Sequence, residues 1–198
     1  MPGAEKRRLA NRGLAAAALF FFLAPAPAQQ PADTQLRRCS ACHGPQGNSQ
    51  VPTIPSLAGQ PQLFIENQMV LIREGLRDFP EMRGVLDGMT DAEIVAMAKY
   101  FSSQKPVRTA AGPADPAAFQ RGKALAEKTR CGTCHLPGYT GRQQIPRLAG
   151  QHEEFLLHAM KQFRDHPGPG RDTIMAASLY GLKDAELADI AHFLAHLE

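Results

Sequence analysis

The chain has 198 residues, with 22 Lys and Arg against 19 Asp and Glu, seven His, four Cys and no Trp. Its formal charge of +3 lies entirely in residues 1–28, which hold four basic residues and one acidic residue, so residues 29–198 are formally neutral. The overall charge therefore gives no support to a nucleic-acid-binding face.

The first 28 residues are arranged like a secretory signal peptide. A basic stretch precedes an apolar run from Leu14 to Leu23, and small residues follow up to Ala28. The apolar run is shorter than a membrane span requires. We therefore predict cleavage near Ala28 and a mature protein in the periplasm, with an uncleaved N-terminal anchor as the alternative. Peripheral association with a membrane stays open.

All four cysteines fall in two copies of one motif, and each copy ends in His. The copies are Cys39-Ser40-Ala41-Cys42-His43 and Cys131-Gly132-Thr133-Cys134-His135. Cys-x-x-Cys-His is the attachment motif of c-type haem, because both sulfurs reach one porphyrin and the adjacent His lies under its iron. The sequence therefore predicts two covalently bound haem c groups.

Three other interpretations of the cysteines are weaker. A zinc site from two Cys-x-x-Cys pairs favours a separation of about 15–20 residues, whereas 88 residues separate these pairs. A thioredoxin-like redox pair needs a strand-to-helix context that the sequence does not show. Two structural disulfides would leave the two identically placed histidines unexplained.

The surroundings of the motif are duplicated as well. Residues 54–60 (Ile-Pro-Ser-Leu-Ala-Gly-Gln) recur at 145–151 as Ile-Pro-Arg-Leu-Ala-Gly-Gln. This repeat predicts two small haem modules in tandem. We expect domain 1 over 29–104 and domain 2 over 119–198, joined by a Pro- and Gly-containing linker over 105–118.

Helices are predicted in the same order in each half, and strand signals are nearly absent. A short helix precedes each motif, over 33–38 and over 119–128. An amphipathic helix follows each repeated segment, and a closing helix begins after 90–93 and after 183–186. The apolar positions of these later helices are Ile65, Met69, Ile72 and Leu76, then Ile94, Met97, Ala98 and Phe101, then Leu156, Met160 and Phe163, then Leu187, Ile190, Ala191 and Leu194.

A second protein ligand would occupy the open coordination position of the haem iron and favour electron transfer. Met82 and Met175 lie in irregular stretches between two helices, 39 and 40 residues after the motif histidines. Met69 and Met160 instead fall on the apolar stripes of helices, where methionine usually packs in a core. We therefore favour Met82 and Met175, with His166 as a competitor in the second half. The histidines without a counterpart in the first half, expected at surface or ordinary helix positions, are His152, His158, His166, His192 and His196.

With these motifs the chain resembles the dihaem cytochromes c4 of bacteria. Residues 44–49 (Gly-Pro-Gln-Gly-Asn-Ser), the stretches 81–84 and 98–104, and both Leu-Ala-Gly-Gln segments carry the resemblance. It implies an all-α fold of two tandem cytochrome c-like haem domains related by a pseudo-twofold axis. The stretch before Cys39 is shorter than in that family, so a shortened first helix is expected there.

The resemblance also implies the roles of individual residues. The implied axial ligands are His43 and Met82 in domain 1 and His135 and Met175 in domain 2. Pro55 and Pro146 match the prolines whose carbonyl groups steady the axial imidazoles.

The predicted function is that of a periplasmic dihaem c-type cytochrome, not an enzyme, that carries single electrons between respiratory complexes. The expected donor is a quinol-oxidising complex or a dehydrogenase, and the expected acceptor is a terminal oxidase. The alternative is a dihaem electron-accepting subunit of a flavin or other dehydrogenase. A haem enzyme such as a peroxidase would need an exchangeable iron site, and the matched methionines argue against one.

Overall fold

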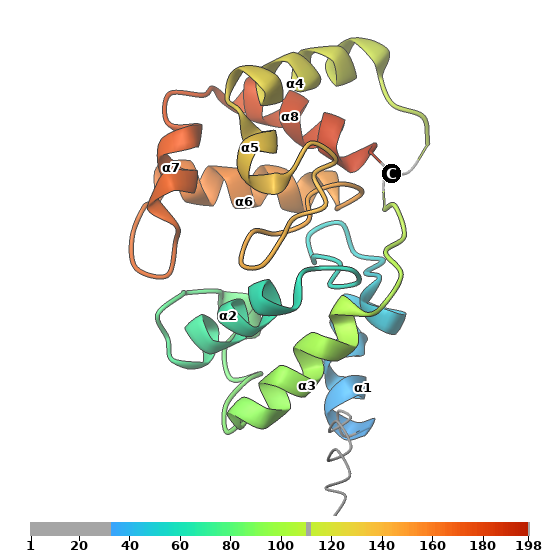
Figure 1. Ribbon diagram of the computed structural model, residues 1–198, viewed down its shortest axis with the longest axis vertical. Helices are drawn as coiled ribbons and strands as arrows, with labels where there is room; N and C mark the ends of the chain where they lie inside the picture. Colours follow the sequence, from blue (N-terminus) through green and yellow to red (C-terminus); the bar gives the residue numbers. More distant parts are fainter. Residues whose placement is uncertain (1–32, 110–111, 198) are drawn as a thin grey trace, which may run out of the picture.

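The computed structural model describes residues 33–109 and 112–197, so the predicted signal peptide and its cleavage site near Ala28 lie outside the described residues. Two helical domains are stacked along the long axis of the molecule, as Figure 1 shows. The described residues form no strand beyond an isolated bridge between Arg142 and Ile145. The predicted all-α fold is confirmed.

The two domains repeat one order of elements. Domain 1 consists of α1 (Asp33–His43), η1 (Pro45–Gly47), α2 (Gln62–Arg73), η2 (Pro80–Met82) and α3 (Asp91–Ser102), where η marks a 3-10 helix. Domain 2 consists of α4 (Pro116–Lys128), α5 (Cys131–His135), α6 (Glu153–Asp165), α7 (Thr173–Leu179) and α8 (Asp184–Ala195). In Figure 1, α2 and α6 lie on the inner sides of the two domains, whereas α3 and α4 lie toward the outer ends.

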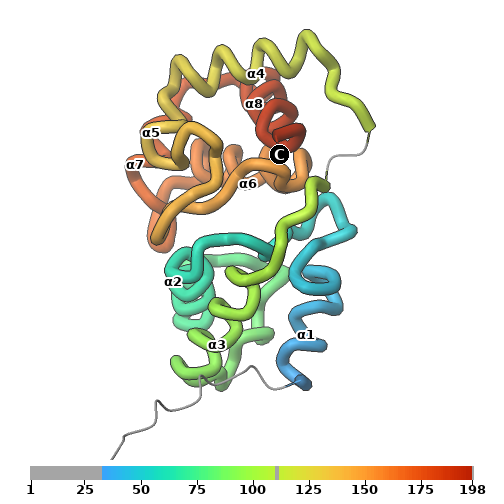
Figure 2. The backbone as a smooth tube through the Cα atoms, turned by 45° about the vertical axis from the view of Figure 1, so that its right-hand side comes forward, coloured from blue at the N-terminus to red at the C-terminus, as the bar shows by residue number. Residues whose placement is uncertain are grey.

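Helix α4 begins inside the stretch 105–118 that the sequence predicts as a linker. The connection between the domains runs along one side of the molecule, from the end of α3 to the start of α4 (Figure 2). Helix α4 begins at Pro116, three residues before the predicted start at Phe119. Asp115 caps it, because its Oδ1 accepts from the amides of Ala117 and Ala118 at 2.8 and 3.0 Å. Proline at the first helical position lacks an amide that would need a partner there.

Both closing helices begin with a side chain bound to the backbone at the helix start. Thr90 is the N-cap of α3, and its hydroxyl accepts from the amide of Glu93 while its own amide donates to the Glu93 carboxylate at 2.7 Å. At the start of α8, the amide of Lys183 donates to the Glu186 carboxylate at 2.8 Å. Asp91 is therefore a first-turn acid rather than the cap.

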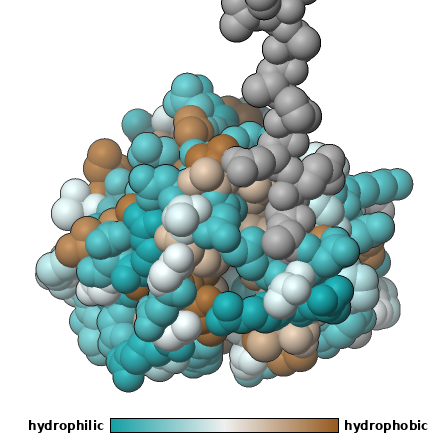
Figure 3. Space-filling view, turned by 90° about the horizontal axis from the view of Figure 1, so that it is seen from below, coloured by the Kyte–Doolittle hydropathy of each residue, from teal (hydrophilic) through white to brown (hydrophobic). Residues whose placement is uncertain are grey.

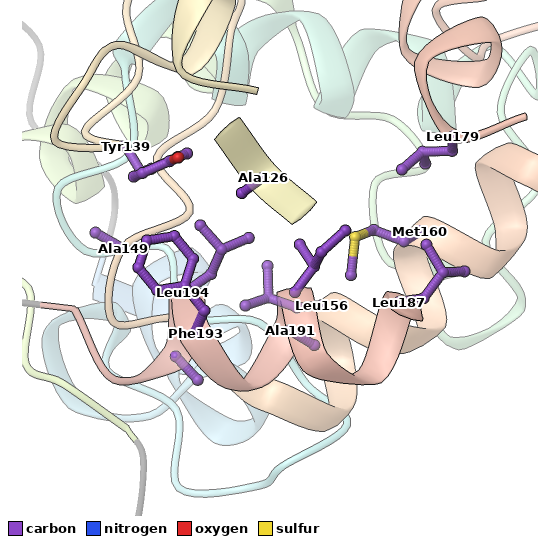
Figure 4. Packing of buried hydrophobic residues seen from close by; sticks show 12 residues of the cluster. Ala126, Tyr139, Ala149, Leu156, Met160, Leu179, Leu187, Ala191, Phe193 and Leu194 are labelled. Atoms are coloured by element: carbon purple, nitrogen blue, oxygen red, sulfur yellow. The ribbon is translucent and has the colours of Figure 1, made fainter. Parts of the chain in front are cut away.

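Each domain has its own core, built mainly from the amphipathic helix and the closing helix. In domain 2, side chains of α6 and α8 face each other, and Figure 4 shows Leu156 and Met160 beside Leu187 and Ala191. The fully or largely buried members of the domain 1 core are Ile65, Met69, Leu86, Ile94, Met97, Ala98 and Phe101. These are largely the positions that the helical periodicity predicts.

Helix α4 packs closely against α8 in domain 2. A Cβ atom at Gly122 would lie 1.9 Å from the Asp189 carbonyl oxygen and 2.8 Å from Cβ of Phe193, so only glycine allows this approach. Arg121 binds the Asp189 carboxylate with two hydrogen bonds of 2.7 and 2.8 Å. Helix α1 is described from Asp33 and runs directly into the first haem motif, so the described part of domain 1 has only six helical residues, 33–38, before its motif.

Two glutamine side chains hold the domains together in a reciprocal way. The Gln60 amide group donates to the Arg147 carbonyl and accepts from the Arg147 amide, both at 2.9 Å. The Gln151 amide group makes the same pair of bonds with Ser56, again at 2.9 Å. Gln60 corresponds to Gln151 in the repeat, and Ser56 corresponds to Arg147. The contacts are therefore related by a pseudo-twofold axis.

His152 lies at this domain boundary rather than on the surface or an ordinary helix position, so that expectation was wrong. Its side chain is buried, and its Nε2 donates to the Ser49 carbonyl at 3.1 Å. Three residues later, the amide of Phe155 donates to the Pro52 carbonyl at 3.1 Å. A buried imidazole needs such a partner, and here the partner belongs to the other domain.

On the visible part of the domain 1 end, hydrophilic side chains surround the apolar groups, which Figure 3 shows as small patches. Among the described residues, the most exposed large apolar side chains are Ile174, in the first turn of α7, and Tyr180, directly after α7. Among the described residues, no helix has the length and apolar character needed to cross a bilayer.

Candidate haem sites

Each Cys-x-x-Cys-His motif is helical, which brings its two thiols and its imidazole together. Cys39, Cys42 and His43 form the last turns of α1. The second motif forms the short helix α5, which is set off from α4 by Arg130 in the left-handed conformation, with φ of 57°. In both motifs the first Cys is partly buried, the second is exposed and the His is buried.

The two imidazoles are oriented by backbone carbonyl groups. His43 Nδ1 lies 2.8 Å from the Pro55 carbonyl oxygen, and His135 Nδ1 lies 2.9 Å from the Pro146 carbonyl oxygen. A carbonyl oxygen can only accept, so each Nδ1 carries the proton and donates. Each Nε2 is thereby left with a free lone pair, which is the form that binds iron.

Burial lowers the pKa of both His43 and His135, and the hydrogen bond from Nδ1 opposes this shift less strongly. Both rings are thus kept neutral as well as oriented, as a metal ligand requires. The chain approaches His135 closely at Gly141, whose amide donates to the His135 carbonyl at 3.1 Å. A Cβ atom at Gly141 would lie 2.4 Å from the Pro146 carbonyl carbon, and its φ of 72° also favours glycine.

The thiols are not arranged as a nucleophilic redox pair. Burial raises the pKa of Cys39 and of Cys131, which keeps these thiols protonated. Reactive Cys-x-x-Cys pairs instead lower the pKa of one thiol. A buried first Cys beside an exposed second Cys and a buried neutral His fits two thioether bonds and one iron–nitrogen bond.

The methionines occupy two kinds of position. Met69 and Met160 are buried in the middle of α2 and α6, where they belong to the two cores. Met82 ends the 3-10 helix η2, whereas Met175 lies inside α7 and not in an irregular stretch as predicted. Both are partly buried and pack against the core of their own domain. The competitor His166 is exposed just after α6.

A cavity of about 300 Å³ lies between the domains, and two arginines that precede Met82 and Met175 line it. Burial lowers the pKa of Arg77 to about 10, and the charge of Arg171 adds to this effect. Arg77 Nε is buried and has no hydrogen-bond partner among the described residues. These two guanidinium groups, which line the cavity together with Asp78 and Glu81, could bind acidic substituents such as the two propionates of haem c.

Models of two protein families match the two halves of the chain. The model described as "Cytochrome c" matches residues 119–198. The model described as "Cytochrome C oxidase, cbb3-type, subunit III" matches residues 26–101. With the geometry above, two cytochrome c domains, each with its motif, bind two covalently attached haem c groups.

Two relatives and one solved structure match most of the chain. "Cytochrome c4" of Azotobacter vinelandii is 34% identical over 176 residues, covering 80% of this chain and 84% of the relative. The crystal structure of reduced recombinant cytochrome c4 from Pseudomonas stutzeri superposes with a TM-score of 0.75 at 29% identity, covering 86% of this chain and 100% of that one. "Thiosulfate dehydrogenase electron acceptor" of Thiomonas intermedia is 31% identical over 197 residues, covering 93% of this chain and 90% of the relative. The chain belongs to the dihaem cytochrome c4 family of electron-transfer cytochromes.

Proposed function

We propose that this protein is a periplasmic one-electron carrier between respiratory complexes, with no catalytic activity of its own. Bound haem c supplies a Fe(III)/Fe(II) couple in each domain. The observation that carries the proposal is the pair of buried His rings, each fixed by a proline carbonyl at 2.8 and 2.9 Å. Rings held this firmly keep their place when the charge on iron changes, which favours electron transfer over ligand exchange.

Met82 and Met175 are the proposed second axial ligands. Met69 and Met160 already fill core positions on α2 and α6, and moving either to iron would leave a cavity in its domain. His166 is exposed, and no described contact holds its side chain toward the core of domain 2. Thioether sulfur opposite imidazole favours Fe(II), so both domains should have fairly high potentials.

Absorption spectra test this ligand set. Oxidised wild-type protein should show the weak far-red absorption band of methionine sulfur bound to haem iron. Met82→His and Met175→His should each remove the part of this band that comes from the substituted domain. A wild-type band that survives in the Met82→His/Met175→His double variant would contradict the assignment. Fast binding of CO or cyanide to the untreated protein would instead support a haem enzyme.

The proposed donors are a quinol-oxidising complex or a dehydrogenase, and the proposed acceptor is a terminal oxidase. Residues 29–198 are formally neutral, which fits brief and weak docking rather than a stable charged interface. The secretory pattern of residues 1–28 supports the periplasm. Mass spectrometry of the N-terminus of the native protein tests export, because cleavage near Ala28 predicts a mature chain of about 170 residues.

A second candidate function is the electron-accepting subunit of a dehydrogenase. The similarity to the thiosulfate dehydrogenase electron acceptor of Thiomonas intermedia, over 93% of this chain, favours this candidate. Affinity purification of the tagged protein from native membranes and periplasm separates the two. A stable one-to-one complex with a dehydrogenase would support the subunit, and recovery as a free dihaem protein that reduces an oxidase would support the carrier.

A further inference from the structure

A second group of metal-binding side chains lies in domain 2, apart from the haem motifs. Glu153 is the first residue of α6, His192 lies in the last turn of α8, and His196 follows directly after α8. One ligand atom from each of these three side chains lies within 4.8 Å of the others. The two imidazole rings are tilted against each other, with centroids 4.2 Å apart.

The His196 ring has a buried lone pair without a partner. Its Nδ1 lies 2.8 Å from the His192 carbonyl oxygen, and a carbonyl can only accept, so Nδ1 carries the proton. Nε2 of the neutral ring is therefore an acceptor. This atom is buried and has no hydrogen-bond partner among the described residues. Burying a polar atom without a partner costs free energy, so such an atom in a folded protein calls for an explanation.

The other two side chains of the group are already joined. His192 Nδ1 donates to a Glu153 carboxylate oxygen at 3.0 Å, and His192 Nε2 accepts from the amide of Asp115 at 3.0 Å. The facing groups on α4, α6 and α8 thus hold a carboxylate, an imidazole nitrogen and the free Nε2 in one place. Two imidazoles and one carboxylate are typical zinc ligands, and three protein ligands leave a fourth position for water.

We propose that Glu153, His192 and His196 bind one Zn²⁺ ion in domain 2. The ion takes the place of the proton between His192 Nδ1 and Glu153, and His196 Nε2 gains its missing partner. The displaced ring proton of neutral His192 moves to Nε2, so no proton is released overall. Nε2 then no longer accepts from the Asp115 amide, so the hydrogen bond of 3.0 Å between them is exchanged for the bonds from the three side chains to the ion.

Domain 1 provides an internal comparison, because the same helices carry no such group there. In the repeat, Glu153, His192 and His196 correspond to Gln62, Lys99 and Ser103. None of these three is a usual zinc ligand. The duplicated fold therefore does not need these side chains for stability, and the site belongs to domain 2 alone. It lies outside both haem sites, so the proposal does not depend on the proposed axial methionines.

Isothermal titration of the purified dihaem protein with ZnCl₂ at neutral pH tests the proposal. We expect one Zn²⁺ per chain, and a weakening of binding of at least about tenfold in His196→Gln and in His192→Gln. His158→Gln, which removes a histidine outside the group, is the matched control and should bind like the wild type. His196→Gln keeps the bond between Glu153 and His192, so a folding defect is least expected in that variant.

Thermal unfolding gives a second readout, because an ion that binds only the folded state raises Tm. Zn²⁺ should raise Tm of the wild type and of His158→Gln, and should leave Tm of the His192→Gln/His196→Gln double variant unchanged. The visible spectrum should not change on addition of Zn²⁺, because the haem ligands are not involved. The proposal is overturned if the wild type shows no saturable binding, or if the double variant binds Zn²⁺ as tightly as the wild type.

Discussion

The side chain of Gln151 holds both backbone polar groups of Ser56, a residue of the other domain, with two hydrogen bonds of 2.9 Å. Gln60 does the same to Arg147. Each glutamine side chain thus pairs with the amide and the carbonyl of one residue across the boundary, as a neighbouring backbone segment would. Because the two contacts are equivalent by the repeat, the orientation of the domains follows from two copies of one short segment.

Gln151→Ala should loosen the domain boundary. It leaves the buried amide and carbonyl of Ser56 without partners, at a cost of about 1–3 kcal/mol for each group. Hydrogen exchange followed by mass spectrometry should show faster exchange in peptides that contain Ser56, with little change at the haem motifs. Gln120→Ala, on the exposed face of α4, is the control. Unchanged exchange at Ser56 in Gln151→Ala would mean that the contact does not hold the boundary.

The sequence predicts the haem residues well because their signals are local. Adjacent positions in Cys-x-x-Cys-His specify one chemistry, and Thr90 with Glu93 marks a helix start within four residues. The contacts of Gln60 and Gln151 join residues 87 and 95 positions apart, so no local pattern reveals them. The repeated Leu-Ala-Gly-Gln segments were visible, but their pairing with the opposite copy was not.

Two features of domain 2 were missed for different reasons. Helix α7 is only seven residues long and follows a stretch rich in Gly and Pro, so its periodicity is too short to detect. The four-residue spacing of His192 and His196, at the C-terminal end of α8, could have indicated that they share a face. The third member, Glu153, lies 39 residues from His192 along the chain, and only the fold brings it there.

Gly122→Ala should destabilise domain 2. The new Cβ would lie 1.9 Å from the Asp189 carbonyl oxygen, so α4 and α8 would have to separate. Such overpacking costs about 1–3 kcal/mol, and the close contact is with rigid helix backbone. Chemical unfolding followed by the visible haem spectrum measures the loss. Gly168→Ala, where nothing lies within 4 Å of the new Cβ, should leave the unfolding midpoint nearly unchanged. Equal midpoints for the two variants would contradict the close packing of α4 on α8.

Arg73 closes the loop that carries Met82. Its Nη1 donates to the Met89 carbonyl at 2.8 Å and lies 2.9 Å from a carboxylate oxygen of Asp91, so it ties the end of α2 to the start of α3. Arg164 repeats this arrangement in domain 2 with the Leu182 carbonyl and Asp184, both at 2.7 Å.

Arg73→Gln should therefore weaken methionine ligation in domain 1 only. When the pH is raised, about half of the far-red band of this variant should disappear at a lower pH than in the wild type. The reason is that a looser loop releases the methionine sulfur more easily. Arg73→Lys keeps the charge but not the forked geometry of the guanidinium group. It should therefore lose the band at a pH between those of Arg73→Gln and the wild type. Arg37→Gln is an exposed control. If the far-red band of Arg73→Gln depends on pH as in the wild type, the loop that carries Met82 is held by other contacts.

Asp184 links stability to acid pH. Hydrogen bonds from Lys161 and Arg164 lower the pKa of its carboxyl group in the folded protein. A group with a lowered folded pKa stabilises the fold above its unfolded pKa of about 4, and this contribution is lost as pH falls through the lowered value. Asp184→Asn should therefore be less stable than the wild type at neutral pH, and the two should converge below about pH 3. Urea unfolding at a series of pH values measures both the difference at neutral pH and the convergence in acid. Asp87→Asn is an exposed control. If the difference in free energy of unfolding between Asp184→Asn and the wild type stays constant down to about pH 3, Asp184 acts through packing and not through its charge.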